Sequence, residues 1–283
     1  ELASCLVGSE MCIRDRRLMK RILSAAAVLA LSASLLVGCS SGTASSVPVS
    51  ASSAAESTVS SVEETASSAV DENEAAAAQL LNDLTGSYQE LWPVILADEY
   101  KQTWLDDCTA LVGEDNAEAA FEKLSSMVTG DVYGEDAVKA YANGGGAYFC
   151  GFTNSLAILT FDGETSTISG TDKDGNVLFS HTYHYIGMEP VHGLYEFESD
   201  DADSGEFTYF FLAPDTSAET YHIEFRYGSD AEALSQYDAG EYAYWLASGI
   251  STDCDQTMID NCIELFCTCL LYTSPSPRDK RQS

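Results

Sequence analysis

The spacing of apolar residues changes near Ala147, and this change constrains the fold more than any other feature of the sequence. Beyond Ala147, apolar and polar residues alternate with a period of two, the pattern of β-strands that bury one face. The alternating segments are short, and turn-forming Gly, Asp and Asn separate them. Closing such a sheet into a barrel removes its exposed edges. The predicted strands are Tyr148–Phe152, Leu156–Phe161, Ser166–Ser169, Val177–Ile186, Gly193–Phe197, Phe207–Ala213 and Tyr221–Tyr227.

Before Ala147 the spacing is helical. Apolar residues recur every three or four positions, as at Trp104, Cys108 and Leu111. We therefore predict an α+β chain that is mainly β, an antiparallel β-barrel of the lipocalin or calycin type flanked by helices. The predicted helices are Glu74–Leu84, Ala97–Val112, Asn116–Val128, Gly134–Tyr141, Asp230–Tyr237 and Asp255–Phe266.

The stretch from Ser40 to Cys267 is strongly acidic. Of the 45 Asp and Glu and 13 Lys and Arg in the sequence, this stretch holds 41 acids and 5 bases, a formal charge of −36 (5 minus 41). Such a surface repels nucleic-acid phosphates and anionic lipid headgroups. We therefore expect no nucleic-acid partner and no electrostatic docking to membranes, whereas cations are attracted.

Residues 19–39 have the pattern of an export signal. They begin with Met-Lys-Arg, continue with an apolar run too short to span a bilayer comfortably, and end in Leu-Val-Gly-Cys at Cys39. The last four residues resemble the bacterial lipobox, and this resemblance implies that Cys39 is the lipid-modified first residue of the mature protein. The alternative is an ordinary signal peptide with an incidental Cys. We expect the chain to be lipid-anchored on the extracytoplasmic face of a bacterial cell membrane.

The remaining sequence divides into a tether, one domain and two terminal segments. Residues 40–75 are rich in Ser and Ala and contain no aromatic residue, so we expect a flexible tether. Residues 76–267 form the domain, because 28 of the 29 Phe, Trp and Tyr lie between Leu84 and Cys267 and can build a core. Residues 1–18 and 268–283 resemble translated sequencing-adapter ends, and we exclude both from the fold.

The domain contains five cysteines. Outside the cytoplasm some of them can pair, and Cys254 with either Cys262 or Cys267 are the nearest candidates in the sequence. No Cys-x-x-Cys occurs, so neither a thiolate zinc site nor a thioredoxin-like motif is indicated. The five residues are Cys108, Cys150, Cys254, Cys262 and Cys267.

The last predicted strand contains a His-x-Glu pair. His222, Glu224 and Arg226 share one face of that strand, and the strand rise separates the imidazole from the carboxylate by about 6.5–7 Å. Both groups can ligate one cation if another strand supplies a third donor. Neutral imidazole with carboxylate suits zinc. The alternative is a solvated strand face on which Glu224 and Arg226 neutralise each other.

A second group of histidines occurs at His181 and His184. The two side chains point to opposite faces of a strand, so both cannot enter one barrel interior. We take His181 as the candidate for the third metal ligand, the alternative being a hydrogen-bonded core residue. The sequence contains no serine elbow, catalytic triad or carboxylate pair, and we therefore expect a binding protein rather than an enzyme.

Several segments resemble the ZinT domain family. They are Leu-Thr-Gly-Ser-Tyr-Gln-Glu-Leu-Trp-Pro-Val at Leu84–Val94, Ala213-Pro214, Tyr-His-Ile-Glu-Phe-Arg-Tyr-Gly-Ser-Asp at Tyr221–Asp230, and Tyr-Ala-Tyr-Trp at Tyr242–Trp245. ZinT is an extracytoplasmic zinc- and cadmium-binding module with a calycin-like barrel, and it also forms the C-terminal part of AdcA-type zinc-uptake lipoproteins. The resemblance implies capture of a divalent metal ion, zinc, and delivery to a metal ABC importer, without catalysis.

The resemblance also implies a ligand set. The family places one His three residues before Ala-Pro, where this chain has Phe210, and a His-x-His on the next strand. Here His222 matches and Glu224 replaces the second His, which leaves His181 as our candidate for the missing donor. The alternative function is a barrel that has lost its metal site and binds a small organic ligand or a protein partner at the cell surface, with Phe210, Phe211 and nearby Tyr side chains lining an aromatic pocket.

Overall fold

The computed structural model describes residues 72–213 and 222–272. The predicted export signal with Cys39, most of the tether and the terminal segment before residue 19 lie outside these ranges, as does the chain after residue 272. From Asn73 onward the described residues belong to one unit.

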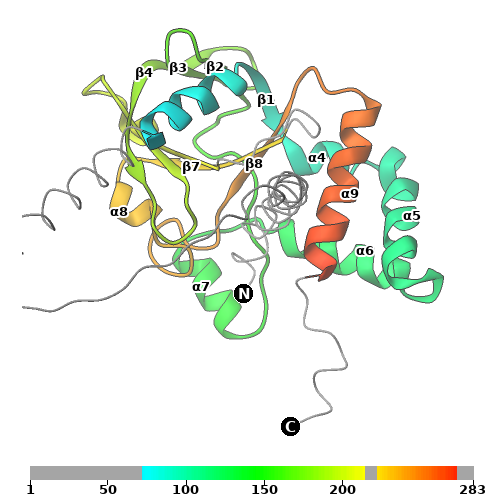
Figure 1. The fold of residues 1–283 in the computed structure, drawn as a ribbon. Helices are drawn as coiled ribbons and strands as arrows, with labels where there is room; N and C mark the ends of the chain where they lie inside the picture. Colours follow the sequence, from blue (N-terminus) through cyan, green and yellow to red (C-terminus); the bar gives the residue numbers. More distant parts are fainter. Residues whose placement is uncertain (1–71, 214–221, 273–283) are drawn as a thin grey trace, which may run out of the picture. The chain divides into compact units, whose positions relative to one another are not determined.

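The strands close into a barrel in sequence order, with every neighbouring pair antiparallel and β8 returning to β1 (Figure 1). This confirms the predicted fold class. The strands are β1 Gly86–Glu90, β2 Ile158–Asp162, β3 Thr167–Thr171, β4 Val177–Met188, β5 Tyr195–Ser199, β6 Tyr209–Leu212, β7 His222–Gly228 and β8 Ala247–Ser251.

The sequence pattern missed β1 and β8 and wrongly assigned a strand to Tyr148–Phe152. All five residues of β8 are buried, so its sequence shows no alternation of apolar and polar residues. β1 lies between two helical segments, and only its central residue is buried. Tyr148–Phe152 makes only isolated bridges, through Phe149 to Thr129 and Trp245, and crosses beside the barrel without joining it.

Most helices match the predicted ones to within four residues, and they include one that the sequence did not indicate. The last helix continues to Tyr272, six residues beyond its predicted end at Phe266 and into the terminal segment that we excluded from the fold. Residues 72–83 are helical and take in the end of the expected tether. The unpredicted helix is α4, whose Pro93 lies in the first turn, where it costs no hydrogen bond. No helix in the described ranges is long and apolar enough to cross a bilayer. The labelled helices are α4 Leu91–Ile95, α5 Lys101–Val112, α6 Glu114–Val128, α7 Glu135–Ala142, α8 Ala231–Leu234 and α9 Gln256–Tyr272.

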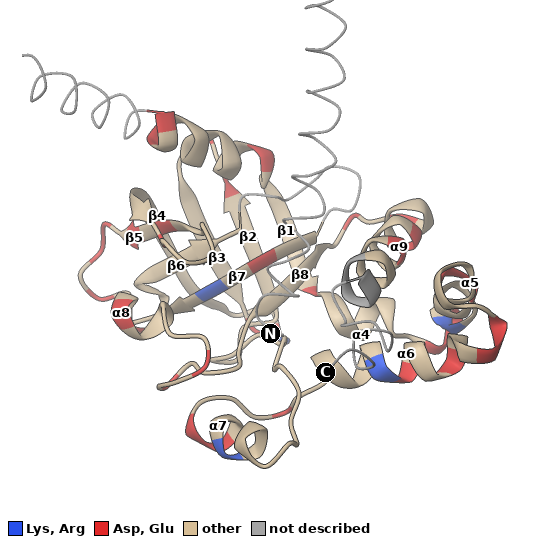
Figure 2. Ribbon diagram, turned by 60° about the horizontal axis from the view of Figure 1, so that its bottom comes forward, with Lys and Arg blue, Asp and Glu red and all other residues tan. Residues whose placement is uncertain are grey.

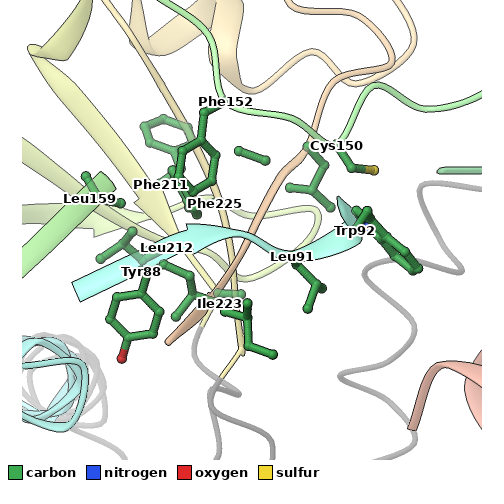
Figure 3. Packing of buried hydrophobic residues seen from close by; sticks show 14 of the residues in the cluster. Tyr88, Leu91, Trp92, Cys150, Phe152, Leu159, Phe211, Leu212, Ile223 and Phe225 are labelled. Carbon is green, nitrogen blue, oxygen red and sulfur yellow. The ribbon is translucent and has the colours of Figure 1, made fainter. Parts of the chain in front are cut away.

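Aromatic side chains fill the interior of the barrel. The ring of Phe210 on β6 lies 5.4 Å from Tyr183 and 5.9 Å from Phe179 on β4, and 6.4 Å from Phe225 on β7. Phe152 packs edge-on against Phe225 at 5.3 Å (Figure 3). The contacts of Phe210 with Phe179 and Tyr183 join β6 to β4, two strands that are not hydrogen-bonded to one another, which identifies this side of the sheet as the lumen.

Helix α9 covers the outside of the barrel next to β7 and β8. Its Phe266 ring lies 4.7 Å from Trp92 of α4 and 5.5 Å from His222 of β7. The other side of α9 packs against α5 and α6 (Figure 1). Trp104 of α5 fixes this helical layer to α4 through a hydrogen bond from its Nε1 to the carbonyl oxygen of Ile95 at 2.6 Å.

We predict that Phe210→Ala destabilises the fold by about 3–5 kcal/mol, because the fully buried ring leaves a cavity among rigid neighbours. Denaturant unfolding measures the change. Val177→Ala is the matched control, since Val177 is 69% exposed and its removal should change the free energy of unfolding by less than about 0.5 kcal/mol. Equal effects of the two substitutions would show that the lumen is not packed as described.

Candidate metal-ligand site on strand β7

Every residue of β7 is buried, so both faces of this strand are covered. Phe225 points into the lumen, where it meets Phe210. Since side chains alternate along a strand, His222, Glu224 and Arg226 face the outside of the barrel wall. Their exposed fractions are 1%, 3% and 0%. The predicted shared face is therefore confirmed, whereas the solvated-face alternative is wrong.

Helix α9 shields His222. The Phe266 ring meets the imidazole at 5.5 Å and an angle of 70° between the ring planes. Burial lowers the pKa of His222 from 6.5 to about 4 because the charged form loses its solvation. At neutral pH the imidazole is therefore uncharged, the form that binds metal ions.

Two cysteine thiols approach Glu224 from other parts of the chain. Cys150 precedes β2 in the sequence and lies beside Trp92 (Figure 3), and Cys262 lies on α9. Burial raises the pKa of both thiols, and the charge of Glu224 raises it further. The outer face of β7 thus brings imidazole, carboxylate and two thiols into one buried region. Sequence reasoning missed both cysteines, because only the closed barrel and the docked α9 bring them near Glu224.

Arg226 anchors a neighbouring segment of the chain through hydrogen bonds and a ring contact. Its guanidinium donates hydrogen bonds to the carbonyl oxygens of Leu234, Gln236 and Tyr242, and it lies 4.2 Å from the centre of the Tyr237 ring. These contacts hold the segment after α8 against the barrel wall. In Figure 2 one blue and one red segment of the β7 ribbon mark its one basic and one acidic residue.

The structure does not bring His181 together with His222 and Glu224, which we call the β7 pair. His181 lies between Phe179 and Tyr183 on the lumen face of β4, with ring distances of 6.0 and 6.5 Å. Its Nδ1 is 2.8 Å from Oδ2 of Asp201. His222 faces the opposite side of the barrel wall, so the two imidazoles cannot share an ion in this arrangement.

The other histidines have carboxylate partners of their own. His184 is exposed, with Nδ1 2.7 Å from Oδ1 of Asp200. His192 lies 3.2 Å from Oε2 of the fully buried Glu189 and stacks near Tyr237 at 3.9 Å. Neither belongs to the region around Glu224.

Phe210, at the position where the resemblance places a ligand, also lies on the lumen side. Its backbone pairs with Tyr227, whereas the next residue, Phe211, pairs with Arg226. Directly paired residues point to the same face, so Phe211 and not Phe210 shares a face with His222 and Glu224. A histidine at Phe210 would therefore point away from the β7 pair.

The donor types around Glu224 suit zinc, but their positions are not those of a formed site. Within residues 72–213 and 222–272, no group of three or more His, Cys, Asp and Glu side chains is arranged to hold a metal ion. Imidazole, carboxylate and thiolate are the ligands that zinc takes in proteins. The thiols would have to lose their protons and move closer before they could bind.

An open hollow of about 480 Å³ lies away from β7, at the start of α7. Two of its carboxylates, Glu135 and Asp136, form exposed ion pairs with the same Lys139 at 3.7 and 3.1 Å. We assign no ligand to it. The hollow is lined by Tyr133, Gly134, Glu135, Asp136, Gly240 and Glu241.

Comparison with known proteins gives structural matches only. No model of a known protein family matches the chain, and no curated protein matches it. Among solved structures, the chain is similar to the Zn(II)-bound ZinT-like domain of Streptococcus pneumoniae AdcA, with 15% identity and a TM-score of 0.40 over 64% of this chain and 87% of that one.

A second match is to the whole of Zn(II)-bound AdcA from Streptococcus pneumoniae. The identity is 14% and the TM-score 0.37, over 66% of this chain. The match spans 34% of AdcA, so this chain corresponds to about a third of that longer protein. Both descriptions concern zinc-bound proteins.

We predict that His222 makes the metal-free protein sensitive to acid. Between pH 6.5 and about 4 the unfolded chain binds a proton at His222 that the folded chain does not. The free energy of unfolding should therefore fall as the pH falls through this window, with His222 contributing about 1.4 kcal/mol per pH unit. Urea unfolding at several pH values, with a chelator present, measures this slope.

The slope should become shallower in His222→Gln and stay unchanged in His184→Gln, whose side chain is exposed. Identical slopes in the wild type and in His222→Gln would contradict the burial of a neutral imidazole.

Proposed function

We propose that this chain is a lipid-anchored extracytoplasmic protein that captures or buffers a divalent metal ion, zinc in the first place, for uptake. One observation carries the proposal: His222 and Glu224 share a buried face of β7, and the charge of Glu224 acts on the buried thiols of Cys150 and Cys262. The ZinT-like motifs of the sequence support the same function, because His222 occupies a ligand position of that family.

The chemistry of these groups favours a soft or borderline metal ion. Thiolate and imidazole select zinc over magnesium and calcium, which prefer oxygen ligands. A carboxylate together with one deprotonated thiol would also balance the charge of a dication in a region without solvent. We replace His181 in the ligand set with Cys262 or Cys150, since these two lie on the same side of the barrel wall as Glu224.

Loading this site requires local movement. His222 and Glu224 are covered by α9, so an ion reaches them only when the helix shifts away from β7. Metal binding releases protons from the thiols and is therefore weaker at low pH. We expect slow uptake and slow release, which suits a protein that retains metal until a partner opens it.

The anchor and the surface charge fit this role. A lipid at Cys39 would keep the protein at the membrane, and the tether would let it reach a metal ABC importer. The acidic stretch carries 41 Asp and Glu against 5 Lys and Arg, which raises the local concentration of cations near the site.

The aromatic lumen does not favour the alternative of a small organic ligand. In the lumen, the Phe210 ring is packed against Phe225 and both are 0% exposed, whereas Phe211, also 0% exposed, lies on the outer face of the wall. A ligand would have to displace this core.

Isothermal titration calorimetry tests the proposal. Bound metal is first removed from the purified full chain, which is then titrated with zinc. We expect one high-affinity site in the wild type and a loss of at least about tenfold in affinity in His222→Ala and in Glu224→Gln, since each removes one inner ligand. Cys262→Ser and Cys150→Ser should identify the thiol that completes the site by a similar loss.

His181→Ala and His184→Ala are the matched controls. Both remove an imidazole that pairs with an aspartate away from β7, so neither should change the high-affinity binding. Weak, non-saturating uptake, or wild-type affinity in His222→Ala, would exclude the proposed site.

A further inference from the structure

Two buried thiols meet at the contact between α5 and α9. Sγ of Cys108 lies 3.8 Å from Sγ of Cys267, and both side chains are 0% exposed. They are far apart in the sequence, so spacing alone gives no sign of this pair. The sequence favoured Cys254 with Cys262 or Cys267, whereas the fold places Cys267 against Cys108.

We propose that Cys108 and Cys267 form a disulfide that fastens α9 to α5, with a small-molecule or protein disulfide as the oxidant. The two sulfurs need to approach by less than about 2 Å to reach bonding distance, because a disulfide bond is about 2.05 Å long. The proposal rests on the extracytoplasmic location in the proposed function, because disulfides persist in oxidising compartments.

The reaction is thiol–disulfide exchange in two steps. The Cys108 thiolate attacks an external disulfide RS–SR, forms a mixed disulfide and releases one RS⁻, which takes up the proton lost from Cys108. Cys267 then loses its proton to the second leaving thiolate as its sulfur attacks the Cys108 sulfur. Two protein thiols are oxidised to one disulfide, and one external disulfide is reduced to two RSH.

The local environment assigns the attacking sulfur. The pKa of Cys108 is lowered because its sulfur is hydrogen-bonded to Cys267, and the same bond raises the pKa of Cys267. Thiolate is the nucleophile in exchange, so Cys108 attacks first and Cys267 resolves the mixed disulfide. Since neither sulfur is exposed, the reaction occurs while the chain folds or when the end of α9 opens.

The disulfide would restrict the movement of α9, the helix that covers His222 and Glu224. Cys267 follows Phe266, the residue that contacts His222. Tying this turn of α9 to α5 restricts the movement that exposes His222 and Glu224. The linked protein should therefore hold α9 closed, and the reduced protein should let it open more readily.

Peptide mapping of the purified full chain tests the disulfide without any metal. The chain is reduced, transferred to a buffer with oxidised glutathione, treated with a thiol-blocking reagent and digested without reduction. We expect mass spectrometry to find the Cys108 peptide joined to the Cys267 peptide, and the number of free thiols to fall by two per chain. Cys254→Ser is the control and should leave this linked peptide unchanged.

Hydrogen–deuterium exchange of α9 gives a second readout on the same samples. Oxidation should slow exchange in α9 of the wild type and leave it unchanged in Cys108→Ser. Recovery of Cys108 and Cys267 as separate blocked thiols, or a Cys254–Cys267 link as the main product, would overturn the proposal. Either result is independent of zinc affinity, so failure of this proposal is distinguishable from failure of the proposed metal site.

Discussion

The burial of β7 on both faces is the constraint on which the rest of the structure depends. Its lumen face carries Phe225, which packs with Phe210 in the aromatic core that fills the barrel. Its outer face carries His222, Glu224 and Arg226, and polar groups are costly to bury unless other groups compensate them. Helix α9 and the segment after α8 supply this cover, through Phe266 on one half of the strand and carbonyl oxygens around Arg226 on the other.

Alternation of apolar and polar residues was sufficient to predict the barrel, because most of its strands bury one face. It failed at β8, whose buried small residues leave no alternation, and at Tyr148–Phe152, where alternation reflects packing beside the barrel. The shared face of His222 and Glu224 also followed from strand periodicity. Strand periodicity did not show that this face lies outside the barrel, under α9. The position of α9 depends on contacts between distant residues such as Trp92 and Phe266.

The position of His222 and Glu224 outside the barrel changes which residues can complete the candidate site. A barrel with its donors in the lumen would have made His181 the natural third ligand. With the donors outside the wall, the neighbours are Cys150 and Cys262, and access depends on a helix rather than on the barrel mouth. Under the proposed function, metal capture and the stability of α9 would be linked, because a contact that holds α9 against β7 would also retain the ion. The contact of Cys108 with Cys267 lies where such a fastening would act.

X-ray absorption at the zinc edge tests the central claim most directly, because it reports the atoms bound to the ion. For protein loaded with one zinc per chain, we expect at least one sulfur at about 2.3 Å together with nitrogen or oxygen at about 2.0–2.1 Å. A first shell made only of nitrogen and oxygen would contradict it, since the ion would then lie away from the thiols under α9.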